Sequence, residues 1–219
     1  MLECLTNLCM IDRLPAKFRT RSGNVIVFVR HARTDWNTTG RLQGNRNTVL
    51  SRESIRVCRD LSTEIQVSDL TCYASDRSRA ISTANLLGFA KVHTTPLLRE
   101  RSLGKLEGFK KEYIDRTIGY SNLDSGSQRY GVESDHSVSF RARRFVKQIY
   151  SKKRELVVAF SHGRFMECAI RLPFRVTEPH LQKINNLCCF SMHFDGARFT
   201  LSGQYEHLGQ ALKDLSNAS

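Results

Sequence analysis

NVIVFVRHARTDWNTTGRLQG, residues 24–44, is the stretch from which the organisation of this chain follows. Residues 25–29 are a continuous run of β-branched and aromatic side chains, which is typical of a short strand buried on both faces of a parallel sheet. The run stops at Arg30 and His31 and gives way to a polar loop. Ligands of open α/β sheets bind beyond the carboxyl ends of the strands, so these two residues are expected at the floor of a functional site.

The length of 219 residues and the hydrophobic content of 40% are sufficient for one sizeable core. We expect a single domain over residues 23–219, preceded by an N-terminal arm over residues 1–22. The seven cysteines are odd in number and include no C-x-x-C pair, which favours free thiols and a reducing, cytoplasmic location. We interpret Cys188 and Cys189 as two small hydrophobic residues of a buried strand in preference to a redox-active pair. No stretch approaches the length of a membrane span, so no membrane association is expected.

The net charge of +13 comes mainly from arginine, with 24 Arg and 10 Lys against 21 acidic residues. The planar guanidinium suits bidentate contacts with phosphate, so this excess favours a phosphorylated small-molecule partner. Nucleic acid is the rival partner. It is unlikely, because the basic residues are spread along the whole chain without a basic tail, zinc-finger spacing or an aromatic-basic RNA-binding signature.

The rest of the chain alternates between expected strands and helices. Strands are predicted at 70–74, 92–96, 156–160 and 187–194, and helices at 51–64, 76–87, 137–150 and 164–171. This order predicts an α/β fold, a three-layer α/β/α sandwich with a mostly parallel central sheet. The segment 110–135 lacks a clear period and is rich in Ser, Gly, Tyr and charge, so we expect a mobile lid there.

A second histidine repeats the arrangement of His31, because the apolar run 156–160 is followed by Ser161-His162-Gly163. A histidine that ends a strand is more often structural than catalytic, but further motifs accompany this pair. They are TDWN at 34–37, GRLQG at 40–44, SDRSRA at 75–80, and LRE at 98–100 with Gly104, Glu107 and Gly108 behind it. In this order they resemble the histidine phosphatase superfamily, which includes the cofactor-dependent phosphoglycerate mutases and many small phosphatases. The resemblance runs from Asn24 to Arg171.

The resemblance implies a role for each matching residue. His31 matches the nucleophile, Arg30 and Arg79 match the phosphate-clamping arginines, His162 matches the second pocket histidine, and Glu100 matches the proton donor. The loop that approaches the phosphate or substrate in this family matches Thr34, Asn37, Gln43 and Gly44. For Trp36 and Ser161, a structural role in shaping the pocket is as consistent with the sequence as a functional one. Arg101 is consistent with a surface charge.

The chemistry of these side chains supports the same roles. A neutral imidazole can attack phosphorus, and surrounding cations disfavour its protonated form. Arg30, Arg79 and a protonated His162 would hold the phosphoryl oxygens, so no metal and no cofactor is expected. Glu100 would protonate the leaving oxygen and then activate water, although an ion pair with a neighbouring arginine is the alternative for this residue.

Three positions depart from the family pattern. Ala32 and Arg33 stand where Gly and Glu are common, and Ser54 stands where Gly is common. Ala32 calls for a different backbone path, because Ala does not readily adopt positive φ. The function expected is that of a metal-independent phosphatase that acts through a phosphohistidine. The alternatives are a phosphoglycerate-type mutase and a basic binding or scaffold protein without turnover.

Overall fold

The computed structural model describes residues 24–119, 123, 128–150, 155–171, 183–194 and 199–217. Within them the chain forms one six-stranded sheet in the order β3-β2-β4-β1-β5-β6. The strands are β1 (Asn24–Arg30), β2 (Thr71–Ser75), β3 (His93–Thr95), β4 (Glu155–Ser161), β5 (Cys189–Phe194) and β6 (Phe199–Tyr205). The first four run parallel to one another, whereas β5 is antiparallel to both β1 and β6. The predicted α/β fold with a mostly parallel sheet is confirmed.

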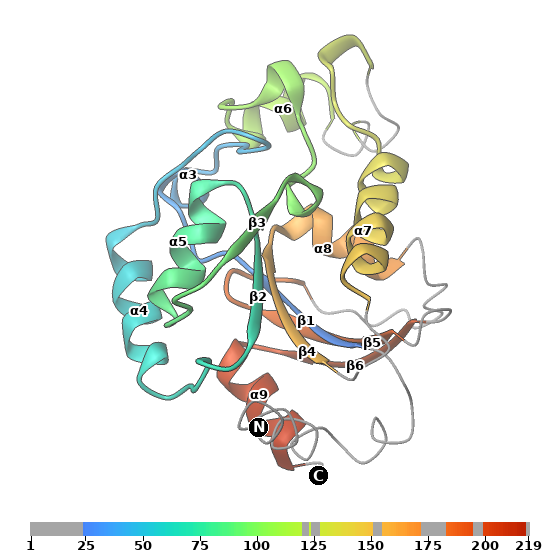
Figure 1. Cartoon of the computed structure of the whole chain (residues 1–219). Coiled ribbons are helices and arrows are strands. Elements are labelled where there is room, and N and C mark those ends of the chain that lie inside the picture. Colours follow the sequence, from blue (N-terminus) through green and yellow to red (C-terminus); the bar gives the residue numbers. More distant parts are fainter. Residues whose placement is uncertain are drawn as a thin grey trace.

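Helices cover both faces of the sheet (Figure 1). They are α3 (Asp35–Thr38), α4 (Arg52–Ser62), α5 (Ser78–Leu86), α6 (Lys111–Thr117), α7 (Asp135–Ile149), α8 (Gly163–Arg171) and α9 (Leu208–Asn217). Alternation along β1 divides the core, because Val25, Val27 and Val29 face one side of the sheet. That side packs against α4, α5 and α9, while Ile26 and Phe28 pack against α7 and α8.

Several elements differ from the sequence-based expectation. The short helix α3, the edge strand β6 and the final helix α9 were not predicted. The segment expected to be an irregular lid contains α6, which anchors by Ile114 to a small apolar cluster with Leu42, Leu103 and Leu106. One buried residue in a helix of seven residues gives no period that could be recognised in the sequence. The arm expected over residues 1–22, and residues 120–122 and 124–127 of the expected lid, lie outside the described residues.

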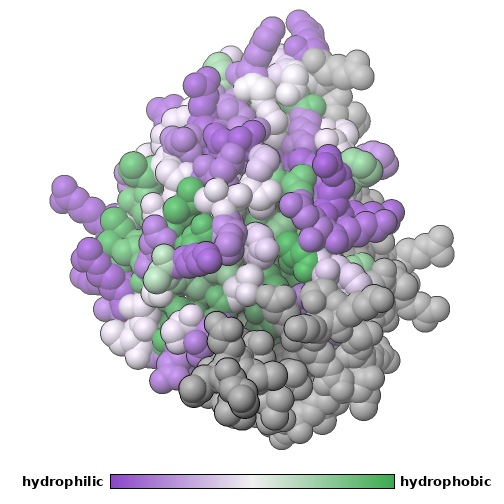
Figure 2. Space-filling view, in the orientation of Figure 1, coloured by the Kyte–Doolittle hydropathy of each residue, from purple (hydrophilic) through white to green (hydrophobic). Residues whose placement is uncertain are grey.

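The cysteines that the structure describes, namely 58, 72, 168, 188 and 189, are all free. Burial raises the pKa of the Cys72 thiol to about 12, which makes it a poor nucleophile. None of the helices within the described ranges combines the length and apolar character that a membrane span needs. Figure 2 shows hydrophilic side chains on the upper part of the molecule, where Figure 1 places α6 and the start of α7.

Candidate active site

The two histidines lie side by side because their strands are neighbours. β1 and β4 are parallel and in register, with Arg30 opposite Ser161, so the residues that follow both strands emerge at one edge. The backbone N–H of His31 donates to the carbonyl of Ser161 at 3.0 Å. The ring centroids of His31 and His162 are 5.1 Å apart. The structure therefore brings together the two residues that the strand-end pattern singled out.

His31 presents a lone pair toward the arginine side of the site. Its Nδ1 lies 2.8 Å from the carbonyl oxygen of Ala32, which can only accept, so Nδ1 carries the proton of the neutral ring. Its Nε2 is then unprotonated and accepts from Nε of Arg79 at 3.2 Å. Burial, followed by the charges of Arg79 and Arg30, lowers the pKa of His31 well below 6.5. The imidazole is therefore neutral and aimed through Nε2, as a nucleophile requires.

Arg79 is the fully buried centre of this arrangement. Its Nε donates to Nε2 of His31 and to Nδ1 of His162, both at 3.2 Å. Its two terminal nitrogens donate to the carbonyls of Arg46 at 2.7 Å and of Gly44 at 2.8 Å. Burial lowers the pKa of Arg79 to about 10, so the guanidinium still carries its charge at neutral pH. The loop carbonyls therefore hold a cation against both histidines.

His162 differs from the sequence-based expectation of a protonated clamp. Burial, followed by the charge of Arg79, lowers its pKa well below 6.5, so the ring is neutral. Nδ1 accepts from Arg79, which places the ring proton on Nε2. The ring has no exposed surface and lies outside the set of residues that line the catalytic cavity. His162 thus orients Arg79 from behind, and a cation at this position would repel it.

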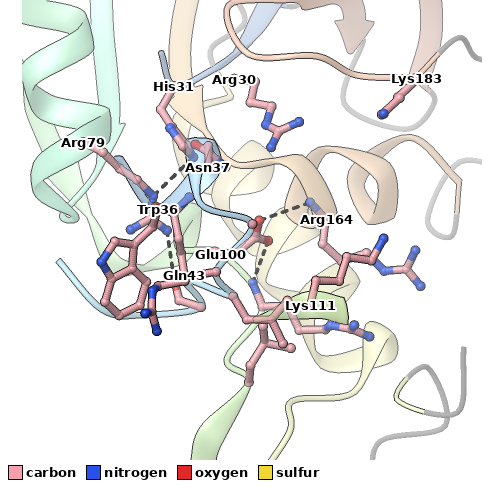
Figure 3. Close-up of a pocket in the computed structure, with 16 residues that line it drawn as sticks. Arg30, His31, Trp36, Asn37, Gln43, Arg79, Glu100, Lys111, Arg164 and Lys183 are labelled. Carbon is pink, nitrogen blue, oxygen red and sulfur yellow. Dashed lines mark hydrogen bonds between the residues drawn. The ribbon is translucent and has the colours of Figure 1, made fainter. Parts of the chain in front are cut away.

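A cavity of about 370 Å³ opens in front of His31 and is strongly cationic. Its basic lining residues are Arg30, Arg41, Arg79, Arg101, Lys111, Arg164 and Lys183, against the single carboxylate of Glu100. Figure 3 shows His31, Arg79 and Asn37 on one side of this space and Glu100, Arg164 and Lys111 across from them. Such a lining matches a multiply charged anion such as a phosphate ester.

Glu100 is held by backbone donors at the start of α8. Its Oε1 accepts from the N–H groups of Arg101 at 2.8 Å and Phe165 at 3.0 Å, and its Oε2 accepts from the N–H of Arg164 at 3.3 Å. The first N–H groups of a helix lack partners within the helix and favour a negative charge. These contacts fix the carboxylate across the cavity from His31.

The predicted loop residues divide into two groups. Asn37 and Gln43 line the cavity, and the amide oxygen of each is occupied, by Thr34 and by Thr48 respectively. Each side chain therefore has its NH₂ group to offer to an anion. Thr34 does not line the cavity: it is fully buried and forms a reciprocal cap with Asn37 at the start of α3. Its hydroxyl is used in the cap, and its role in phosphate binding stays a prediction.

Gly44 lines the same cavity and has φ of +48°. A Cβ at this position would lie 2.2 Å from the carboxylate of Glu107, which accepts from the backbone N–H of Asn45. Both the conformation and the close approach require glycine. The carbonyl of Gly44 that binds Arg79 is therefore positioned by a turn that a larger residue would disturb.

Residues 26–206 match the sequence profile of the histidine phosphatase superfamily (branch 1). The chain belongs to this superfamily. It is 29% identical over 204 residues to a phosphoglycerate mutase-like protein of Arabidopsis thaliana, covering 84% of this chain and 86% of the relative. It is also 31% identical over 153 residues to a metal-independent phosphoserine phosphatase of the same plant, covering 63% of each chain.

Solved structures show the same fold. A mycobacterial glucosyl-3-phosphoglycerate phosphatase superposes with a TM-score of 0.67 at 25% identity, covering 82% of this chain and 97% of that one. A phosphoglycerate mutase of Bacillus anthracis superposes with a TM-score of 0.70 at 19% identity, covering 88% of this chain and 96% of that one. A protein named as a phosphatase and a protein named as a mutase therefore share this architecture.

The departures from the histidine phosphatase pattern are accommodated without strain. Among the described residues other than glycine, only Leu187 has positive φ, so Ala32 sits in an ordinary backbone conformation. The N–H of Ala32 donates to the hydroxyl of Thr83 at 3.0 Å. Ser54 accepts the hydroxyl proton of Ser51, which caps α4. Ala32 therefore needs no positive φ at this position.

Arg101 was expected to be a surface charge, and this expectation is wrong. Its side chain is 1% exposed and donates to the carboxylate of Asp135 at 3.2 Å. Asp135 also receives two hydrogen bonds from Arg164, at 3.1 and 2.5 Å. One carboxylate at the start of α7 thus anchors two arginines of the cavity wall. The 34 positions between Arg101 and Asp135 explain why local sequence gave no sign of this contact.

The remaining predicted residues differ in whether they line the cavity. Ser161 donates its hydroxyl to the carbonyl of Leu98 at 2.8 Å and is buried, which is a structural role. Trp36 lines the cavity. Arg30 lines it too, and its Nη1 donates to the carbonyl of Ile184 at 2.6 Å. In the part of the chain that the structure describes, no group of three or more potential metal-ligating side chains comes together.

Proposed function

We propose that this chain is a phosphatase that hydrolyses phosphomonoesters through a phosphohistidine on His31. The observation that carries the proposal is the fixed tautomer of this residue. Its Nδ1–H is held by the Ala32 carbonyl, and its Nε2 lone pair points to Arg79 at the floor of a cationic cavity. A neutral, buried imidazole with an aligned lone pair needs no base to attack phosphorus.

Substrate binding would exchange one contact for another. A phosphoryl oxygen would take the Nε–H of Arg79 that His31 accepts, which frees the Nε2 lone pair. Arg30 and the amides of Asn37 and Gln43 add donors around the same group. Positioning and neutralisation of charge supply most of the catalysis of phosphoryl transfer. The cations of the chain provide that charge, so the proposed reaction is metal-independent.

The reaction would proceed in two steps. In the first, Nε2 of His31 forms a bond to phosphorus, the ester P–O bond breaks, and protonated Glu100 gives its proton to the leaving alkoxide. In the second, water attacks phosphorus, Glu100 takes the proton from that water, and the P–N bond breaks to release phosphate. The backbone contacts of Glu100 hold it across the cavity for both transfers.

Hydrolysis is preferred over a mutase reaction because of the segment that follows Glu100. Only 62 positions separate Glu100 from His162, and they include α6, α7 and β4, which leaves a short cover for the site. A mutase must shield the phosphohistidine from water until the substrate recaptures the phosphoryl group. The mutase reaction is the second candidate, because one relative is named as mutase-like and the other as a phosphatase.

Product partition separates the candidates. Turnover of para-nitrophenyl phosphate in EDTA distinguishes a metal-independent catalyst from a binding or scaffold protein. Incubation with 3-phosphoglycerate and catalytic 2,3-bisphosphoglycerate then compares isomerisation with phosphate release. We expect phosphate release from some ester to exceed isomerisation. Sustained isomerisation with negligible phosphate from every ester tested would establish the mutase reaction instead.

A further inference from the structure

We propose that a groove beside the catalytic cavity binds a planar aromatic ring of the substrate alcohol. Preferred substrates would then be phosphomonoesters that carry such a ring a few bonds from the phosphate, as nucleoside monophosphates do. The inference rests on the proposed phosphatase function and adds a substrate class to it.

The groove has a volume of about 470 Å³ and lies at the start of α6. It is lined by Arg41, Glu107, Gly108, Phe109, Lys110 and Tyr113. Phe109 is 47% exposed and Tyr113 is 55% exposed, so much of both rings is in solvent. The two rings are stacked, with centroids 5.9 Å apart and planes 19° from parallel. A near-parallel aromatic pair that faces solvent is a suitable platform for a further flat ring.

The wall that carries the platform is firmly attached to the catalytic loop. The N–H of Leu42 donates to the carbonyl of Phe109 at 2.9 Å, and the N–H of Gly108 donates back to the carbonyl of Leu42 at 2.7 Å. The N–H of Lys111 donates to the carbonyl of Gly40 at 2.8 Å. These bonds fix the groove relative to the loop after α3, beneath α6 (Figure 1). A preformed site of this kind loses little entropy on binding.

Arg41 connects the groove to the catalytic cavity, because it lines both. Its Nη1 donates to the carbonyl of Gly108 at 2.8 Å, which holds the guanidinium along the shared rim. An ester whose phosphate lies at His31 and whose alcohol extends past Arg41 therefore enters the groove. The proposed occupant is the remainder of the substrate, because the two spaces adjoin at this residue.

The chemistry of the lining favours a heterocycle over an alkyl chain. Flat rings and a flat guanidinium stack on a π system, and the guanidinium adds an electrostatic attraction to the ring face. Arg41, Lys110 and Glu107 surround the platform with hydrogen-bonding groups. These groups suit the polar edges of a nucleobase and would be left unsatisfied by a lipid tail.

The test compares AMP with ribose 5-phosphate, which differ only in the base. We expect kcat/KM of the wild-type protein to be at least about tenfold higher for AMP, the effect of one base–aromatic stack. Phe109→Ala/Tyr113→Ala should bring this ratio close to one, whereas Tyr113→Phe keeps the ring and should keep the preference. Phe140→Ala is the control, because Phe140 is an exposed aromatic on α7, outside the groove. A wild-type ratio near one, or a ratio that survives the double substitution, would overturn the inference.

Binding keeps the test independent of turnover. Calorimetric titration of the His31→Ala protein with both compounds should give a Kd at least about tenfold lower for AMP, and this difference should vanish when Phe109 and Tyr113 are both replaced by Ala. If no ester tested, para-nitrophenyl phosphate included, releases phosphate but AMP still binds preferentially, the phosphatase proposal fails and the groove stands. Equal Kd values for the two compounds reject the groove whether or not the protein is a phosphatase.

Discussion

Nε of Arg79 lies 3.2 Å from Nε2 of His31, the lone pair that would attack phosphorus. The same Nε–H lies 3.2 Å from Nδ1 of His162, so one donor is shared by two neutral rings. A phosphoryl oxygen that takes this donor frees the nucleophile at the moment of binding. In the proposed reaction, Arg79 therefore couples substrate binding to the release of the Nε2 lone pair of His31. This coupling depends on Arg79, His31 and His162 together.

His31→Ala should lower kcat by about a thousandfold or more, as removal of a covalent nucleophile commonly does. The wild-type protein quenched during turnover should carry an acid-labile phosphate on His31, detectable by mass spectrometry at neutral or basic pH. His136→Ala is the matched control, since His136 is exposed at the start of α7. A wild-type rate in the His31 variant would reject the assignment.

Glu100→Gln should slow esters with poor leaving groups by roughly 100-fold or more, in the range of general acid catalysis. The loss should be much smaller for para-nitrophenyl phosphate, whose leaving group needs little protonation. Gln keeps one carbonyl oxygen for the N–H groups of Arg101 and Phe165 and loses only the longer bond from the N–H of Arg164. Equal losses on both kinds of ester would instead make Glu100 a structural or purely electrostatic residue.

The free energy of unfolding should fall as the pH is lowered through 6.5. Burial, with the charges of nearby arginines, lowers the pKa values of His31 and His162 well below 6.5 in the folded protein. Both titrate near 6.5 in the unfolded chain, so the unfolded state binds more protons between pH 6.5 and the lowered values. Within this window, each histidine should lower the free energy of unfolding by up to about 1.4 kcal/mol for each unit that the pH falls. Above pH 6.5 the contribution of both histidines to stability is fully present.

Urea unfolding at pH 7.5, 6.5 and 5.5 measures this dependence. His31→Gln/His162→Gln should show a weaker dependence on pH, because the substituted groups do not titrate. Glu133 and Asp135 also have lowered pKa values, but their contribution is lost only as the pH falls below about 4.5, outside this range. Identical pH slopes for the variant and the wild-type protein would show that the two histidines are not the groups responsible.

Arg101→Ala should destabilise the fold by about 1.5–3 kcal/mol, the usual worth of a buried hydrogen bond to a charged group, because Asp135 keeps its contacts with Arg164. The side chain of Arg101 is 1% exposed, and its loss leaves a cavity beside Asp135. Arg144→Ala is the control, because Arg144 is exposed on the same helix as Asp135 and should change stability by no more than about 0.5 kcal/mol. Chemical denaturation measures the free energy of unfolding of both variants. Equal small losses of stability in the two variants would contradict the importance of the Arg101–Asp135 pair.

The sequence by itself determined the sheet and the ends of its strands. Continuous apolar runs before Arg30 and before Ser161 mark buried parallel strands, and parallel strands in register bring the following histidines to one edge. Motif positions added Arg79 and Glu100, which the structure places at the cavity. The strand β6 was missed because a glycine and polar residues weaken its period. Helix α9 was missed although its buried residues Leu208, Ala211 and Leu215 recur at helical spacing.

Only the tertiary structure decided which charges act together. Local periodicity reports the average burial of a segment, whereas a contact between distant residues depends on how whole elements pack. Arg79 and His162 are 83 positions apart, and burial, followed by the charge of Arg79, lowers the pKa of His162. Arg164 and Lys183 join the cavity only through folding. Thr34 lies outside the cavity lining for the same reason, and its hydroxyl is hydrogen-bonded to Asn37 in the cap.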